Sequence, residues 1–340
     1  MHCAVLLICI LALAGCGGDD EPDRQQPPEP PPTTVGTDMP ERPERPERPK
    51  RPRRPERRAA TVGDGVLLGI GDQNTQMFGD ERFRALRVRY TRLAMPWDAV
   101  FKEPRRLDTW LRAARAAGQR PLVAFNRARG SECPERPCRA PSPARFERAA
   151  REFVRRYPWV RDLQPWNEAN SPTQPTGKRP ELAAAYYRKL KKVCSGCSIT
   201  AADVLPADRW LDDFLAALGG ERPKLWGLHN YSDVNRFKEE GTRAFLDKVD
   251  GEVWLTETGP IHSFSTGDGR VLFKPDADRS VRATDQAVRL ARLDKRITRL
   301  YLYQWRRTNP QDRFDSGLTG PNGAERPALT RLRELLLEDR

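Results

Sequence analysis

Two glutamates in this chain could carry paired acid–base chemistry. Each ends a short apolar run: Glu168 within Trp-Asn-Glu-Ala-Asn at 166–170, and Glu257 within Leu-Thr-Glu-Thr-Gly at 255–259. When two carboxyl groups are held close together, one can protonate a leaving group while the other attacks as an anion. The two glutamates are distant in the sequence, so the fold must bring them together.

Other polar and aromatic groups follow apolar runs in the same way. His229 comes directly after the run at 225–228 and Tyr231 two residues later, and Trp305 follows the run at 300–303. The active site of a (β/α)₈ barrel is built from residues at the C-terminal ends of several strands. We therefore expect these runs to be strands that deliver their last residues to one common face.

The whole region from 61 to 340 alternates predicted strands with predicted helices. Strands are predicted at 66–71, 88–93, 121–125, 163–166, 198–202, 225–228, 253–256 and 300–303. Apolar residues recur at helical spacing at 107–117, 144–157, 180–193, 207–218, 243–249, 281–293 and 327–337. This alternation predicts an α/β fold with a parallel sheet, and eight units predict closure into a single TIM barrel. An open doubly wound sheet is the alternative, but no Gly-rich phosphate loop follows the first strand.

The order of these motifs resembles that of the retaining glycoside hydrolases of clan A. In that clan an Asn-Glu on strand 4 supplies the acid/base and a Glu on strand 7 the nucleophile, which implies these roles for Glu168 and Glu257. The motifs are most similar to family 39 and its relatives, whose members cleave xylosides, uronides or bacterial exopolysaccharides. Ala169 departs from the pattern, because those relatives commonly have Pro there.

The resemblance also implies roles for residues around the glutamates. Arg92 and Tyr231 match the groups that hold the nucleophile, Asn167 matches the residue that bonds the sugar 2-hydroxyl, and Trp305 matches the apolar floor under the sugar. His229 is expected to line the cleft. Further cleft candidates, chosen by position alone, are Trp97, Asn126, His262 and Phe264.

A retaining mechanism sets a distance that the fold must meet. The two carboxyl groups lie about 5 to 5.5 Å apart in retaining enzymes and about 6.5 to 9.5 Å apart in inverting ones. Strands 4 and 7 face each other across a barrel mouth, so we expect about 4.5 to 6 Å between Glu168 and Glu257. This chemistry requires no metal and no organic cofactor.

The N-terminus carries the features of an export signal. Residues 4–14 form an apolar run of signal-peptide length, too short to span a bilayer as a helix. Residues 13–16, Leu-Ala-Gly-Cys, resemble a bacterial lipobox, in which Cys16 is lipidated and becomes the new N-terminus. An ordinary signal peptide is the alternative, and residues 1–3 lack the usual Lys or Arg. We expect a signal peptide at 1–15 and an extracytoplasmic protein anchored by lipid to the bacterial cell membrane.

A spacer is predicted between the lipidated Cys16 and the barrel. Residues 16–60 are dominated by Pro, Glu and Arg, with too few apolar groups to offset chain entropy. Repeated Glu-Arg-Pro units at 41–49 favour extended polyproline-type chain, so the segment should act as a semi-rigid stalk. We therefore expect 61–340 to be the only globular domain.

The formal net charge of +13 comes from the globular part. Residues 19–40 carry one base against six acids, and residues 41–58 carry nine bases against four acids, so the stalk is neutral. Such a charge favours an anionic partner, or it reflects a coding bias toward arginine. No basic run alternates with aromatics, which argues against nucleic acid. The expected partners are a carbohydrate substrate and, through the lipid, the membrane; we expect a monomer.

The seven cysteines divide into two groups. Cys3 and Cys9 lie in the signal and Cys16 is expected to be lipidated, while the domain keeps Cys133, Cys138, Cys194 and Cys197. In an exported protein the latter four predict two local disulfides, Cys133 with Cys138 and Cys194 with Cys197. One zinc ion could not reach all four, because the pairs fall at opposite faces of the predicted barrel. A redox role for the second pair is disfavoured, because a barrel lacks the activating helix N-terminus.

Two classes of function follow from these features. The first is an envelope-tethered retaining glycoside hydrolase that cleaves O-glycosidic bonds of a poly- or oligosaccharide. The second is a surface lipoprotein that binds glycans or envelope partners on a degenerate barrel. The joint presence of both glutamates with Arg92, Tyr231 and Trp305 favours the enzyme, because a chain that had lost catalysis would not keep such a set.

Overall fold

The computed structural model describes residues 59–131, 133–134, 137–206, 208–309 and 311–338. They belong to a compact unit that runs from Glu56 to Arg340. The predicted signal peptide, Cys16 and all but the last two residues of the predicted stalk lie outside the described residues. Within the described ranges, no helix combines the length and the apolar character needed to cross a bilayer.

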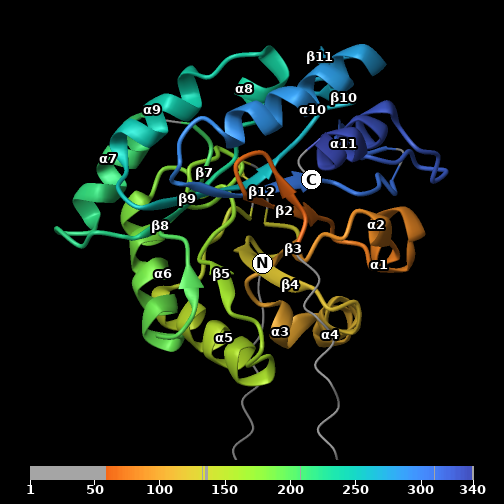
Figure 1. The fold of residues 1–340 in the computed structure, drawn as a ribbon. Helices are drawn as coiled ribbons and strands as arrows, with labels where there is room; N and C mark the ends of the chain where they lie inside the picture. The colour runs from red at the N-terminus through yellow and green to blue at the C-terminus, as the bar shows by residue number, and fades with distance from the viewer. Residues whose placement is uncertain (1–58, 132, 135–136, 207, 310, 339–340) are drawn as a thin grey trace, which may run out of the picture. The chain divides into compact units, whose positions relative to one another are not determined.

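Parallel strands form the centre of this unit (Figure 1). They pair in the order β6-β5-β4-β3-β2-β12-β9-β8-β7. The bounds are β2 (Val66–Gly71), β3 (Tyr90–Pro96), β4 (Arg120–Asn126), β5 (Asp162–Gln164), β6 (Ser198–Ile199), β7 (Asp203–Val204), β8 (Leu225–Leu228), β9 (Glu252–Thr258) and β12 (Ile297–Tyr303). All eight predicted strands are present, with ends that differ by a few residues.

The ring of strands closes through the predicted fifth strand, which is split into β6 and β7. β6 pairs with β5 and β7 pairs with β8, so the two ends of the pairing order belong to one chain segment, 198–204. In the interruption, the Thr200 N–H donates to the Leu163 carbonyl and the Ala201 N–H donates to the Leu225 carbonyl. The backbone therefore bonds to both neighbouring strands, and the predicted barrel is confirmed.

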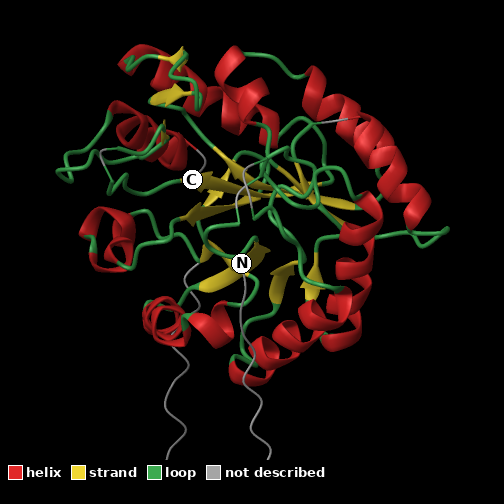
Figure 2. Ribbon diagram, turned by 180° about the vertical axis from the view of Figure 1, so that it is seen from behind, coloured by secondary structure: helices red, strands yellow, loops and turns green. Residues whose placement is uncertain are grey.

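Helices surround the strands, as Figure 2 shows in red around yellow. The seven predicted helices are observed as α4 (Pro104–Ala116), α5 (Pro143–Arg156), α6 (Pro180–Val193), α7 (Asp208–Ala217), α9 (Glu240–Lys248), α10 (Ala277–Ala291) and α11 (Pro327–Glu338). Several begin with Pro, which is favourable at the first helical position because its missing N–H would have no partner there. Their apolar faces pack on the strands and form one large core.

Several short elements were not predicted, because each is too brief to show a period in the sequence. The loops after the first, second and sixth barrel strands contain α1 (Gln76–Gly79), α2 (Glu81–Ala85), α3 (Ala99–Lys102) and α8 (Tyr231–Arg236). A further strand, β1 (Thr61–Val62), pairs antiparallel with β2. The loops after the last two barrel strands form a small antiparallel sheet of β10 (Ser263–Ser265), β11 (Val271–Phe273) and β13 (Phe314–Asp315). This accessory sheet lies at the end of the barrel where the C-terminal strand ends meet.

Both predicted disulfides are present, one between Cys133 and Cys138 and the other between Cys194 and Cys197. The first lies in the loop that follows β4, and the second joins the end of α6 to the start of β6. Each closes a loop of a few residues, so each fixes local backbone rather than the arrangement of distant elements.

Candidate active site

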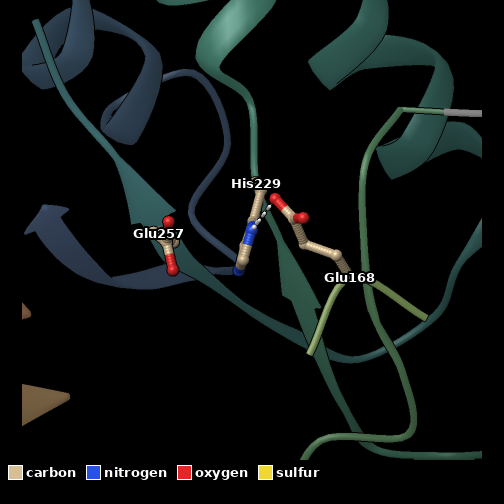
Figure 3. Close-up of side chains that lie close together, drawn as sticks. All are labelled: Glu168, His229 and Glu257. Carbon is tan, nitrogen blue, oxygen red and sulfur yellow. Dashed lines mark hydrogen bonds and ion pairs between the residues drawn. The ribbon is translucent and has the colours of Figure 1, made fainter. Parts of the chain in front are cut away.

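The fold brings the two predicted catalytic glutamates together. Glu257 is the sixth residue of β9, and Glu168 lies just beyond the end of β5. One oxygen of each carboxyl and one ring nitrogen of His229 all lie within 4.8 Å of one another. His229 stands between the two carboxyl groups (Figure 3). The two glutamates therefore share one small site at the C-terminal end of the barrel.

The backbone around Glu168 is held in an uncommon conformation. Glu168 has a φ of 47°, a left-handed value that strains a residue with a side chain. Hydrogen bonds to neighbouring strands fix it: the Asn167 N–H donates to Phe125 O at 2.7 Å, and the Ala169 N–H donates to Asp203 O at 2.9 Å. A proline at 169 would lack this second donor, so the departure from the family pattern has a structural reason here.

Glu257 is held by two side chains. Arg92 on β3 forms an ion pair with Oε2, and the Tyr231 hydroxyl donates to Oε1 at 3.2 Å. Burial, and then the negative charge of Glu257, raise the pKa of Tyr231 well above its ordinary value. The phenol therefore stays protonated and can donate. Arg92 and Tyr231 thus stand where the resemblance implied nucleophile supports would be.

His229 contacts the other glutamate. It is fully buried, its Nδ1 lies 3.1 Å from Glu168 Oε1, and its Nε2 lies 3.1 Å from Asp203 Oδ2. Burial alone would lower the pKa of His229, but Asp203 and then Glu257 outweigh burial and raise it to about 10. A charged imidazole donates from both nitrogens and has no lone pair for a metal. The cluster of Glu168, His229 and Glu257 thus has the spacing of a metal site but favours a proton.

Arg92 is the hub of the site, and its side chain is 1% exposed. Its Nε donates to Gln164 Oε1 at 2.7 Å, and its Nη2 donates to Asn167 Oδ1 at 2.6 Å and to Asp203 Oδ2 at 2.8 Å. Because all three nitrogens of the guanidinium donate, its orientation against Glu257 is fixed. Asn167, the residue expected to bond the sugar 2-hydroxyl, is held beside Glu168 by the same hub.

Trp305 is not the platform that the sequence suggested. It is 1% exposed, its ring meets the Phe83 ring edge to face at 5.5 Å, and its indole N–H donates to Asp80 at 3.2 Å. A ring covered in this way offers no face to a sugar. Tyr303, the last residue of β12, is instead half-buried, and the charge of Glu257 contributes to raising its pKa after burial.

The remaining positional candidates lie around the site rather than in it. Trp97 is 7% exposed and packs under the Arg145 guanidinium, and Asn126 lines a separate pocket of about 380 Å³ bounded by β3, β4 and α4. Phe264 on β10 contacts Phe314 on β13, whose ring in turn meets Tyr231. His262 is half-buried beside the same sheet. Among the hydrogen bonds of the described residues, none joins one of these four side chains to the carboxyl group of Glu168 or Glu257.

Sequence reasoning missed three residues of the hydrogen-bond network and one neighbour of Glu257. Gln164 and Asp203 accept from Arg92, the Thr256 hydroxyl donates to Asp203, and Tyr303 feels the charge of Glu257. Asp203 directly follows the predicted fifth strand, just as the glutamates follow theirs, so its position was a usable signal. Gln164 and Thr256 lie within predicted strands. From the sequence alone, a polar strand residue that faces the barrel interior cannot be distinguished from one that faces a helix. Tyr303 is the last residue of its predicted strand. It could have been found by choosing the residue at the strand end instead of the nearby Trp that the resemblance favoured.

The charged state of His229 predicts how stability depends on pH. A histidine whose folded pKa is raised stabilises the fold fully below its unfolded pKa of about 6.5, and this stabilisation is lost as pH rises toward 10. The free energy of unfolding should therefore fall between about pH 7 and 10 in urea titrations. In His229→Gln the fall should be shallower. Burial lowers the pKa of His262, so its titration changes the free energy of unfolding only below about pH 6.5 and cannot account for a fall above pH 7. Equal slopes in both proteins would show that His229 is neutral.

Comparisons with known proteins agree with this fold. Among solved structures, a family 39 glycoside hydrolase from Bacteroides cellulosilyticus WH2 has a TM-score of 0.55 and 16% identity, over 80% of this chain and 64% of that one. Xylanase 10B from Thermotoga maritima has a TM-score of 0.55 and 11% identity, over 81% and 95%. The family 1 β-glucosidase from Thermotoga maritima has a TM-score of 0.57 and 10% identity, over 83% and 99%. This chain thus spans just under two thirds of the family 39 enzyme.

A sequence comparison with family models identifies the group to which the chain belongs. No curated protein matches the chain in sequence. The model of the glycosyl hydrolase catalytic core matches residues 148–327, which is more than half of the chain and includes Glu168 and Glu257. Because this match joins the barrel and the paired carboxyl groups, the chain belongs to the glycosyl hydrolase catalytic core family.

Proposed function

We propose that this protein is a retaining glycoside hydrolase in which Glu257 is the nucleophile and Glu168 the acid/base. The observation that carries the proposal is the short separation of the two glutamates, with oxygens within 4.8 Å of each other. Inverting enzymes need about 6.5 to 9.5 Å between the carboxyl groups, to leave room for a water. The spacing here suits direct attack by a carboxylate.

The two glutamates differ in their surroundings in the way that this chemistry requires. Each oxygen of Glu257 has a partner: Arg92 forms an ion pair with Oε2, and the Tyr231 hydroxyl donates to Oε1. These contacts orient the carboxyl group, which suits Glu257 to be the attacking group. Glu168 is the more exposed, at 25% of its side chain against 13% for Glu257, so it can exchange protons with water.

In the first step a Glu257 oxygen attacks the anomeric carbon while Glu168 gives its proton to the departing oxygen. This forms a glycosyl ester on Glu257. In the second step Glu168, now a carboxylate, takes a proton from water, which attacks the same carbon and releases the sugar from Glu257. Two inversions leave the anomeric configuration unchanged.

The stereochemistry of the first product tests this mechanism. An aryl glycoside that the protein cleaves should give a product with the configuration of the substrate, seen by proton NMR before mutarotation. Release of the opposite anomer would reject the retaining mechanism while leaving a glycosidase. The substrate screen should include β-xylosides, β-glucosides and β-glucans, because structural neighbours are named as a xylanase, β-glucosidases and an endoglucanase.

We further propose that a lipid on Cys16 tethers the enzyme to the outside of the bacterial cell membrane, with residues 16–60 as the stalk. The proposal is supported by the lipobox-like residues 13–16, by the Pro-rich segment after them and by the two disulfides of the domain, a bond typical of exported proteins. The substrate would then be a poly- or oligosaccharide within reach of the cell envelope.

A single substitution tests the anchor. The wild-type protein should partition into the detergent phase and carry acyl mass on Cys16, whereas Cys16→Ser should be released or remain unprocessed. Because position 16 lies outside the domain, both forms should cleave a soluble glycoside at the same rate. An unmodified mature N-terminus at another residue would exclude the lipid anchor.

A further inference from the structure

One buried carboxylate in the site has no role in the two-step reaction. Asp203 is the first residue of β7 and is 0% exposed. Burial alone would raise its pKa, but His229 and Arg92 outweigh burial and hold the pKa below its usual range. Asp203 is therefore a buried anion between two cations.

Its contacts connect the supports of the two catalytic residues. Oδ2 accepts from Arg92 Nη2 at 2.8 Å and from His229 Nε2 at 3.1 Å. Arg92 in turn contacts Glu257, and His229 contacts Glu168. Oδ1 accepts a hydrogen bond from the Thr256 hydroxyl on β9. Asp203 thus has one bridge to each glutamate and a third bond that fixes its own rotamer.

A glycine on the neighbouring strand β8 leaves space for the Asp203 side chain. A Cβ at Gly227 on β8 would lie 2.6 Å from Asp203 Oδ1, which is closer than a carbon can approach, and 3.0 Å from Gln164 Nε2, which is a tight contact. Glycine at this barrel position leaves room for a carboxylate deep below the catalytic mouth. The site is built around Asp203 as much as around the glutamates.

We propose that Asp203 is a positioning residue that holds Arg92 against Glu257 and His229 against Glu168, so that one buried carboxylate aligns both catalytic glutamates. Its charge also offsets the two cations, which would otherwise repel each other at 3.3 Å between Arg92 Nη2 and His229 Nε2. Four charged or titratable groups face His229 and set its affinity for a proton. They are Asp203 from β7, Arg92 from β3, Glu168 from the loop after β5 and Glu257 from β9.

Asp203→Asn tests the proposal with little change in shape. An amide that turns its oxygen to Thr256 turns its NH₂ toward Arg92 and His229, so donors meet donors and His229 must give up the proton on Nε2. The proton affinity of His229 should fall at least about tenfold, because a nearby opposite charge shifts a pKa by roughly 1 to 3 units. The kcat should fall on the order of 10²-fold, as for a misplaced catalytic group, while KM changes little.

The titration of His229 can be followed by its own imidazole NMR signal, because the domain has only two histidines, His229 and His262. Imidazole NMR of the wild type should show His229 charged from pH 5 to 9 and His262 titrating at lower pH as an internal reference. In Asp203→Asn, His229 should titrate within this range and His262 should be unchanged. A His229 titration equal to that of the wild type, or an unchanged kcat, would overturn the proposal.

A matched control is available at the other end of the barrel. Asp162 on β5 is also fully buried and also accepts from two arginines, Arg120 and Arg299, but it lies away from the glutamates. Asp162→Asn should leave the His229 titration and the kcat of folded protein unchanged. If Asp203→Asn does not fold, Thr256→Val removes the third bond of Asp203 and should lower kcat severalfold, and Thr256→Ser should restore it.

The kinetic part of this test rests on the proposed glycosidase function, but the titration does not. If the wild type cleaves no glycoside in a broad panel, the proposed function fails while the His229 titration still decides whether Asp203 organises the site. If the wild type is active and Asp203→Asn is equally active, only the role of Asp203 is rejected.

Discussion

Glu257→Ala is expected to abolish turnover on every glycoside that the wild type cleaves. Without the carboxylate no glycosyl ester can form, and loss of a covalent nucleophile in other enzymes lowers kcat by about 10⁴- to 10⁶-fold. The surrounding fold should persist, because the side chain is partly exposed and Arg92 keeps its bonds to Gln164, Asn167 and Asp203. Initial rates on an activated aryl glycoside, with circular dichroism to confirm folding, measure the effect.

Glu168→Ala should behave differently on the same substrates. Its loss removes proton donation, so glycosides with a poor leaving group should become inert, while those with a dinitrophenolate leaving group should still form the glycosyl ester. Azide should then accelerate turnover by entering the space left by the side chain and attacking the ester, giving a glycosyl azide of retained configuration. Equal, complete loss in both variants on the activated substrate, with no azide product, would contradict the roles assigned to the two glutamates. Only a wild type that cleaves nothing in a broad panel would favour a glycan-binding function.

Arg92→Met is expected to have the largest effect on stability. It leaves Asp203 without its guanidinium partner in the barrel interior, and removing one member of a buried ion pair destabilises a protein by about 3–5 kcal/mol. Activity should also be lost, because nothing else places a positive charge against Glu257 Oε2 in the contacts of the described residues. Urea unfolding gives the first quantity and the rate per folded molecule the second.

Arg299→Met provides the comparison for Arg92→Met. Arg299 is also buried, donates to Asp162 at 2.6 Å and stacks on the Trp254 ring at 3.7 Å, but it lies in the first half of β12, away from the catalytic face. Asp162 would keep Arg120 as a partner, so the stability loss should be smaller. Folded Arg299→Met should keep the wild-type kcat. If folded Arg92→Met also keeps the wild-type kcat, Arg92 acts on stability alone.

The barrel architecture and the two glutamates at the centre of the site could be predicted from the sequence. Apolar runs that alternate with helical patterns indicate parallel strands wherever they occur, because both faces of such strands are buried. Glu168 and Glu257 were identifiable because each ends such a run, and a residue at that position in a barrel necessarily faces the catalytic mouth. The disulfide pairing was also predictable, because each of these cysteines has one other cysteine within a few residues of it in the sequence.

The side chains that work with the glutamates could be identified only from the folded structure. Trp305 matched its expected role by type and position. Its ring is nevertheless buried against Phe83 of the short helix α2, and its indole N–H donates to Asp80, the N-cap residue of that helix. The position of Asp203 at a strand end was visible in the sequence, but its partners Arg92 on β3 and His229 after β8 were not. Such contacts depend on side-chain direction across strands that are distant in the chain, and the spacing along one strand does not encode them.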